Sequence, residues 1–85
     1  MLNAPARTVF DAITDFLATE PNPQAIIDYH LPDDLQARAD YLAQQNGEDL
    51  LTPEERAELQ EFLNADEMFS LLKTKMKLKL RKQAE

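Results

Sequence analysis

The sequence predicts an all-α protein, a small three-helix bundle with a long C-terminal helix. Its 85 residues include one glycine and nine β-branched residues, which leaves little material for tight hairpins or strands. Leucine, alanine, glutamate, glutamine and lysine dominate instead, and all of them favour helices. Apolar side chains also recur at helical spacing along three segments. We therefore expect a single helical domain over residues 1–85.

The first helix is expected over residues 7–19. Four apolar side chains recur there at i, i+4, i+7 and i+8: Val9, Ile13, Phe16 and Leu17. The two prolines within residues 20–23 end this helix, because proline has no N–H for the helical ladder and restricts the residue before it. The short apolar patch that follows, residues 26–31, fits either one helical turn or an extended connection.

The second helix is expected over residues 32–46. Pro32 suits the first turn of a helix, and the carboxylates of Asp33 and Asp34 complement the positive end of the helix dipole. Asn46 and Gly47 are residues that commonly follow the last turn of a helix. Both ends of this helix are therefore indicated by local chemistry.

The third helix is expected over residues 53–82. Thr52 is placed to cap it, Pro53 occupies its first position, and Glu55 can reach back to the backbone of the cap. Neither proline nor glycine follows Pro53, so about 30 residues can form one helix of roughly 45 Å. We expect its first half to pack on the other two helices and its last turns to project.

Two stretches of this third helix allow an alternative structure. Residues 64–66 have the weakest helix propensity and are the expected place for a kink or break. Residues 75–81 alternate strictly between basic and apolar side chains, a pattern that also suits an amphipathic strand. Because Lys, Met and Leu are strong helix formers, helix is the favoured interpretation.

The third helix carries apolar side chains on two sides. A continuous stripe is formed by Leu59, Phe62, Phe69, Leu72, Met76 and Leu80. A second stripe, on nearly the opposite side, is formed by Met68, Leu71 and Leu78. A helix packed on one face has no need of the second stripe. These side chains are therefore either solvated or buried by another chain, and both alternatives stay open.

Charge is segregated along the chain. Residues 1–72 carry fifteen acidic residues against three arginines, whereas six of the nine basic residues fall within ten positions near the C-terminus. These six are candidate phosphate contacts: Lys73, Lys75, Lys77, Lys79, Arg81 and Lys82. Cations at a helix C-terminus also complement the helix dipole. Since the basic segment lacks aromatic residues for base stacking and the acidic remainder would repel a duplex, nucleic-acid binding is the less favoured interpretation.

The residue inventory argues against an enzyme. Cysteine is absent, and His30, Ser70 and Gly47 are the only residues of their types, so no triad, thiolate site or glycine-rich phosphate loop is indicated. The acidic residues lack metal-ligand spacing, and we expect neither a metal nor a cofactor. Without a basic-then-apolar leader or a run of 18 apolar residues, we expect a cytoplasmic protein with no membrane partner.

Three motifs occur in order between residues 31 and 80. They are Pro-x-x-Leu-Gln-x-Arg at residues 32–38, followed by Asn46, then Leu-Thr-Pro-Glu-Glu at 51–55 and Leu-Leu-Lys-x-Lys at 71–75. This pattern resembles a family of short, mostly uncharacterised bacterial proteins, often cyanobacterial and often encoded beside small nucleases. The resemblance implies an antitoxin-like or accessory role and no catalytic residue. Residues 1–30 depart from the family pattern.

The expected function is a non-enzymatic, antitoxin-like interaction module that binds a basic protein, such as a nuclease. An acidic surface would steer this partner: Asp33, Asp34, Asp40, Glu54, Glu58 and Glu61. The expected partner-binding side chains are Phe69, Leu71, Leu72, Met76, Leu78 and Leu80. Homo-oligomerisation is also expected. The alternatives are a nucleic-acid-binding regulator that uses the basic segment and a self-assembling helical scaffold.

Overall fold

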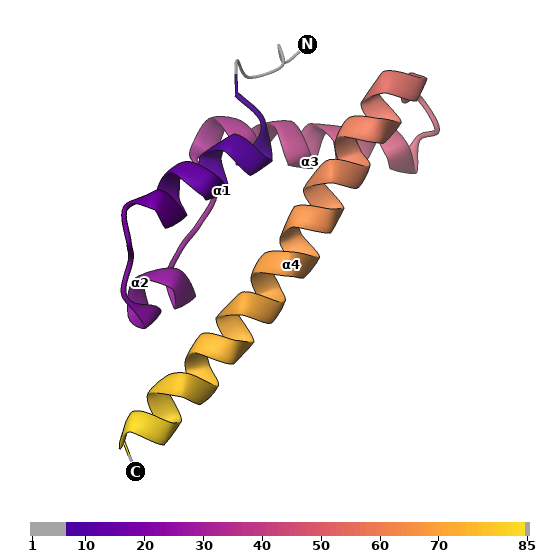
Figure 1. Ribbon diagram of the computed structural model, residues 1–85. Coiled ribbons are helices and arrows are strands. Elements are labelled where there is room, and N and C mark those ends of the chain that lie inside the picture. The colour runs from indigo at the N-terminus through magenta and orange to yellow at the C-terminus, as the bar shows by residue number, and fades with distance from the viewer. Residues whose placement is uncertain (1–6, 85) are drawn as a thin grey trace.

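A computed structural model of the protein describes residues 7–84, which contain four helices (Figure 1). They are α1 (Val9–Ala18), α2 (Pro23–Ile27), α3 (Asp33–Gly47) and α4 (Pro53–Ala84). Of the described residues 79% are helical and none lies in a strand, which confirms the all-α prediction. The molecule is elongated, 50 × 23 × 16 Å, because the 32 residues of α4 alone span about 48 Å. α4 contacts each of the other three helices.

Helix α1 begins at a complete capping box. The hydroxyl of Thr8 accepts a hydrogen bond from the Asp11 backbone at 3.1 Å, and the Asp11 carboxylate accepts one from the Thr8 backbone at 3.2 Å. The chain leaves the helix through Glu20, whose φ of 57° is left-handed, and Pro21 follows. The predicted helix at 7–19 is confirmed to within two residues.

Helix α2 was not among the three predicted helices. The proline-rich segment that ends α1 also starts α2, because Asn22 accepts a 2.8 Å hydrogen bond from the Ala25 backbone and Pro23 occupies the first helical position. The side chain of Ile26, in this helix, is buried. Residues 26 and 27 are therefore the end of a short helix, and residues 28–31 form a connection. Each of the two alternatives left open for residues 26–31 thus holds for part of the segment.

Helix α3 runs through the glycine that was expected to end it. Gly47, the single glycine of the sequence, is the last residue of the helix, and its φ is not positive. The left-handed residue after α3 is Asp49, with φ of 59°. Aspartate is one of the few side chains that tolerate this conformation. The chain thus turns two residues later than the sequence indicated.

Helix α4 begins as predicted and is uninterrupted. The Thr52 hydroxyl accepts a 3.1 Å hydrogen bond from the Glu55 backbone, and Glu55 accepts a 3.0 Å bond from the Thr52 backbone. The expected kink or break at residues 64–66 is not seen, since α4 continues through them as one helix (Figure 1), and Ala65, 1% exposed, packs in the core. Residues 75–81 are helical, as predicted.

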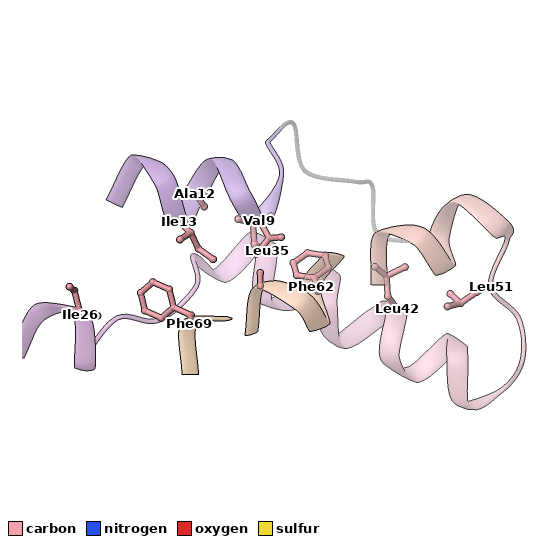
Figure 2. Close-up of a cluster of buried hydrophobic side chains, with 10 residues drawn as sticks. Val9, Ala12, Ile13, Ile26, Leu35, Leu42, Leu51, Phe62 and Phe69 are labelled. Atoms are coloured by element: carbon pink, nitrogen blue, oxygen red, sulfur yellow. The ribbon is translucent and has the colours of Figure 1, made fainter. Parts of the chain in front are cut away.

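The core lies where one face of α4 meets the three shorter helices (Figure 2). Helix α4 contributes Phe62, Ala65 and Phe69. The other buried apolar residues are Val9, Ala12, Ile13, Ile26, Leu35, Leu42 and Leu51. Leu72 and Met76 also pack against this core, so α4 is engaged well beyond its first half. The prediction that the first half of α4 packs on two other helices is therefore incomplete, because it did not include α2, which packs on α4.

Candidate protein-interaction surface

The six predicted partner-binding residues divide between the core and the surface. Phe69 is only 6% exposed, and its ring lies 5.1 Å from that of Tyr29 and 6.4 Å from that of Phe16, measured between ring centres. Leu72 and Met76 are half-buried against the core, and Leu80 is partly buried near the end of α4. Leu71 and Leu78 are 57% and 50% exposed. Only these two of the six are at least half exposed.

The second apolar stripe of α4 is exposed to solvent. Met68, Leu71 and Leu78 are about half exposed and, at 100° per residue, lie within an arc of about 80°. This arc is centred roughly opposite Phe69, which faces the core. Leu63, 53% exposed, lies at the edge of the same side and was not predicted. We call the side that contains Met68, Leu71 and Leu78 the outer face of α4.

A shallow hollow lies on the outer face. Its lining residues follow the helical spacing i, i+3, i+4 and i+7: Asn64, Glu67, Met68 and Leu71. Such a set of four residues surrounds one position on a helix surface, and it is the set that receives a side chain from a second helix in coiled-coil packing. The outer face therefore combines exposed apolar side chains with a group of four residues at the spacing that receives a side chain in coiled-coil packing.

The six basic residues do not form one surface. Lys73 donates a 2.8 Å hydrogen bond from Nζ to the backbone oxygen of Tyr29, and its ammonium lies 5.8 Å from the centre of the Phe69 ring. Lys73 is therefore a structural residue, and the expectation that it contacts phosphate does not fit this placement. The other five are exposed: Lys75, Lys77, Lys79, Arg81 and Lys82. By helical spacing, only the lysines at 75, 79 and 82 follow the outer face.

Acidic residues concentrate on α3, the loop after it and the start of α4. Residues 33–61, which we call the acidic hairpin, contain nine acidic residues and two arginines. Asp33, Asp40, Glu54 and Glu61 are exposed. Asp34 is also exposed and binds Arg7 at 3.2 Å. The predicted acidic surface is thus largely present on this hairpin.

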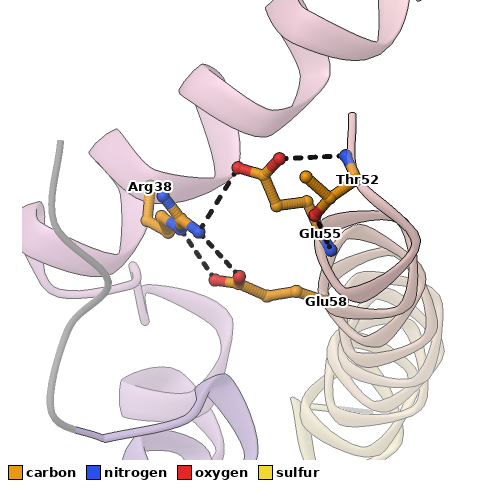
Figure 3. Close-up of polar contacts among 4 residues, drawn as sticks. All are labelled: Arg38, Thr52, Glu55 and Glu58. Atoms are coloured by element: carbon orange, nitrogen blue, oxygen red, sulfur yellow. Dashed lines mark hydrogen bonds and ion pairs between the residues drawn. The ribbon is translucent and has the colours of Figure 1, made fainter. Parts of the chain in front are cut away.

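Glu58 is the member of the predicted acidic surface that binds a buried arginine (Figure 3). Arg38, 7% exposed, donates to both of its carboxylate oxygens, from Nε at 2.8 Å and from Nη2 at 2.9 Å. Nη2 of Arg38 also lies 3.9 Å from the Glu55 carboxylate. The hydrogen bond with Glu58 raises the pKa of Arg38, while burial acts in the opposite direction. This cluster joins α3 to α4, so Glu58 is a structural residue.

The tip of the acidic hairpin presents one exposed leucine. Leu51 is buried at 6% exposure, whereas its neighbour Leu50 is 62% exposed. The left-handed conformation of Asp49 precedes them, and the cap of α4 at Thr52 follows. Leu50 is therefore held between two fixed points of the backbone, with the acidic residues Glu48, Asp49 and Glu54 close to it in the chain. Sequence periodicity could not indicate this residue, because it lies in a loop.

A cavity of about 160 Å³ lies where α1, the connection after α2, and α4 meet. Val9, Ile13 and Phe69 give it apolar walls, and Lys73, already bonded to Tyr29, lies on its lining. His30 and Ser70, each the only residue of its type, line it too. Burial raises the pKa of Tyr29 at the same place, and the positive charge of Arg7 acts in the opposite direction.

Two further features of residues 7–84 bear on function. In this part of the chain no three histidine, aspartate or glutamate side chains are grouped so that they could hold a metal ion. No helix within the same range combines the length and the apolar character needed to cross a bilayer.

Comparisons with protein-family models, with curated proteins and with solved structures found no match to this chain. The similarity of residues 31–80 to the short bacterial family therefore stays a prediction. The surfaces described above are what indicate which partners the chain can bind.

Proposed function

We propose that the protein is a non-enzymatic, antitoxin-like interaction module that binds a basic protein, such as a small nuclease, through its acidic hairpin. The observation that carries this proposal is the exposed Leu50 at the tip of a hairpin with nine acidic residues and two arginines. Charge of one sign attracts an oppositely charged partner and accelerates association. An exposed apolar side chain at the centre of such a region supplies burial when the partner docks.

Arg38 forms an ion pair with Glu58, so these two residues add little net charge to the hairpin surface. The Arg38 guanidinium is buried and bound to Glu58 and Glu55, so its positive charge is directed inward. Arg56 is the other arginine of the hairpin, and it is exposed. A basic partner would therefore meet mainly carboxylates, among them Asp33, Asp40 and Glu54. This contrast in charge favours a basic protein over an acidic one as the partner.

The first test is identification of the partner by co-purification of the tagged protein from its native host, followed by reconstitution from purified components. The expected partner has a basic isoelectric point, and its dissociation constant increases with salt, since charge attraction is screened. Recovery of no partner, or of an acidic partner with salt-independent affinity, contradicts the proposal.

The second test replaces charge and apolar contact at the tip. The variant Glu48→Lys, Leu50→Ala, Glu54→Lys should weaken the reconstituted complex by about tenfold or more, equivalent to about 1.4 kcal/mol. The matched control is Asp15→Lys, Glu20→Lys, which changes the net charge equally at two exposed positions outside the hairpin. Equal weakening by both variants would show that only net charge matters, and would refute a site at the hairpin tip.

A further inference from the structure

We propose that the outer face of α4 binds the outer face of a second copy of the same chain, with the two α4 helices antiparallel. This interface is separate from the hairpin tip, so the inference goes beyond the proposed function and stands or fails independently of it. Three observations support it: the seven-residue spacing of the apolar side chains, the hollow beside them, and the reversal of charge along α4.

The apolar spacing on the outer face suits a partner helix. Leu71 and Leu78 are seven residues apart, and Met68 lies one turn before Leu71. A seven-residue repeat keeps a seam directed at a second helix. The shorter helices α1, α2 and α3 pack on the core side of α4, which carries Phe62, Ala65 and Phe69 (Figures 1 and 2). A second helix can therefore approach the outer face along this seam.

The hollow sets the register of the two helices. If Leu78 of the second copy enters it, the helices are antiparallel and their two-fold axis crosses α4 between Leu71 and Lys75. By symmetry Leu78 of the first copy enters the same hollow on the second copy. In this register Leu71 of each copy enters the next group of four residues on its partner: Leu71, Thr74, Lys75 and Leu78. Leu71 and Leu78 of both copies, four leucines in all, are then buried at one seam.

Charge favours the antiparallel orientation. The part of α4 before Leu71 carries Glu61 and Glu67 beside the seam, and the part after it carries Lys75, Arg81 and Lys82. By the seven-residue repeat, Glu61, Lys75 and Lys82 lie on the Met68 side of the seam, and Glu67 and Arg81 lie on the other side. When the second helix is antiparallel, each side of its seam lies against the same side of the seam on the first copy, with the acidic end of one helix beside the basic end of the other. In the register given above, Glu67 then lies about 4 Å along the helix axis from Arg81 of the second copy, and Glu61 about 4 Å from its Lys82.

A parallel pair would place like charges together. The lysines of the two copies would align with one another, and so would the glutamates, which is unfavourable for close helices. Within one chain, Glu67 and Arg81 are about 21 Å apart along the continuous helix α4. They therefore cannot pair in a monomer, and the charge pattern gains these contacts only from a second copy.

The mass of the protein in solution tests for the dimer. Light scattering is expected to give twice the 9.7 kDa mass of the single chain at high concentration. The variant Leu71→Glu, Leu78→Glu should be monomeric with unchanged helical circular dichroism. The control Leu50→Glu changes an exposed leucine away from α4 and should stay dimeric. A monomer up to millimolar concentration, or a dimer that persists in the double variant, overturns the proposal.

Disulfide trapping tests the orientation, and the chain has no cysteine of its own to interfere. A mixture of Asn64→Cys and Leu78→Cys proteins should form a mixed disulfide dimer, because these positions meet in the antiparallel pair. Leu78→Cys alone should not link to itself, since its two copies lie about 16 Å apart along the axis. Lys77→Cys, on another side of α4, is the control. Self-linking of Leu78→Cys would indicate a parallel pair and would refute the orientation.

Charge exchange gives a third, independent measurement. Glu67→Arg and Arg81→Glu, each alone, should weaken dimerisation by about two- to fivefold, and the double variant should recover the original dissociation constant. Sedimentation at several concentrations measures all three. If the dimer of the double variant is weakened by as much as the two single effects added together, the two residues are not partners. Because none of these positions lies at the hairpin tip, loss of the dimer and loss of the basic partner can be told apart.

Discussion

The ammonium group of Lys73 is bonded to the backbone oxygen of Tyr29 at 2.8 Å, which joins the second half of α4 to the connection between α2 and α3. The residues are 44 positions apart in the chain. A charged donor to a backbone oxygen is a comparatively strong hydrogen bond. The stacked rings of Phe16 and Tyr29, 4.2 Å apart between centres, lie at the same junction. Lys73 is therefore distinguished from the other lysines of α4 by its contacts, although the sequence presents all of them alike.

Replacing Lys73 by methionine should lower the free energy of unfolding by about 1 kcal/mol, because the Tyr29 oxygen loses its donor while the apolar stem of the side chain is retained. Lys75→Met on the exposed outer face is the control and should change it by less than about 0.5 kcal/mol. Urea denaturation of a monomeric background, Leu71→Glu with Leu78→Glu, measures both. Equal effects of the two substitutions would show that the bond to Tyr29 contributes nothing.

Removing the Glu58 carboxylate should be among the more damaging polar substitutions. Glu58→Ala leaves the buried Arg38 with one carboxylate fewer, and we expect a loss of about 2 to 3 kcal/mol. Glu61→Ala, an exposed glutamate one turn later, should cost less than about 0.5 kcal/mol. Thermal unfolding followed by circular dichroism compares them in the same monomeric background. A small effect at Glu58 would mean that Glu55 can replace it.

Stability should decrease at alkaline pH through Tyr29. Because burial raises the pKa of its phenol above 10.0, the unfolded chain releases this proton first as the pH increases. The contribution of Tyr29 is complete below pH 10.0 and is lost as the pH passes the higher value of the folded state. Urea denaturation from about pH 8 to about pH 11 should therefore show a smaller alkaline loss in Tyr29→Phe than in the original protein.

The control for that experiment is Tyr41→Phe, which removes the only other phenol in the chain. If Tyr29→Phe and the original protein lose stability in parallel above pH 10.0, burial of the Tyr29 phenol does not govern the alkaline transition.

Gly47→Ala should stabilise the protein by about 0.5 to 1 kcal/mol. Gly47 is helical and has no positive φ, and no neighbouring atom lies within 4 Å of the position that an alanine methyl group would take, so alanine fits without strain. Asp49→Ala is the contrasting change, since alanine is strained at the positive φ of that residue and should destabilise the turn. Urea midpoints of the two variants should shift in opposite directions. A destabilising Gly47→Ala would mean that the turn needs a glycine there.

Local chemistry made much of the fold predictable. The cap at Thr52 and the proline-rich break after α1 are short-range patterns, and the side chains that form them are neighbours in sequence. The exposure of Leu71 and Leu78 also followed from helical spacing, because a position opposite the core face is fixed by the period of 3.6 residues. These features depend on little besides the residues around them.

The missed features depend on which helices meet. Arg38 and Glu58 are 20 residues apart, and neither pattern nor spacing indicates that α3 and α4 bring them together. Phe69 belonged to the correct stripe, but its assignment to a partner surface failed because it is buried beside the rings of Tyr29 and Phe16. The left-handed turn fell on Asp49 rather than at Gly47, because α3 continues through Gly47.

The uninterrupted course of α4 has a consequence for how the molecule opens. The substantial contacts between helices among residues 7–84 all include α4, so α1, α2 and α3 have little to hold them once it separates from them. Amide hydrogens around Phe62, Ala65 and Phe69 should thus exchange with deuterium only when the whole domain unfolds. Those beyond Leu80 should exchange quickly by fraying of the helix end. A second copy bound along Leu71 and Leu78 would slow exchange over those turns alone, while leaving the acidic hairpin unchanged.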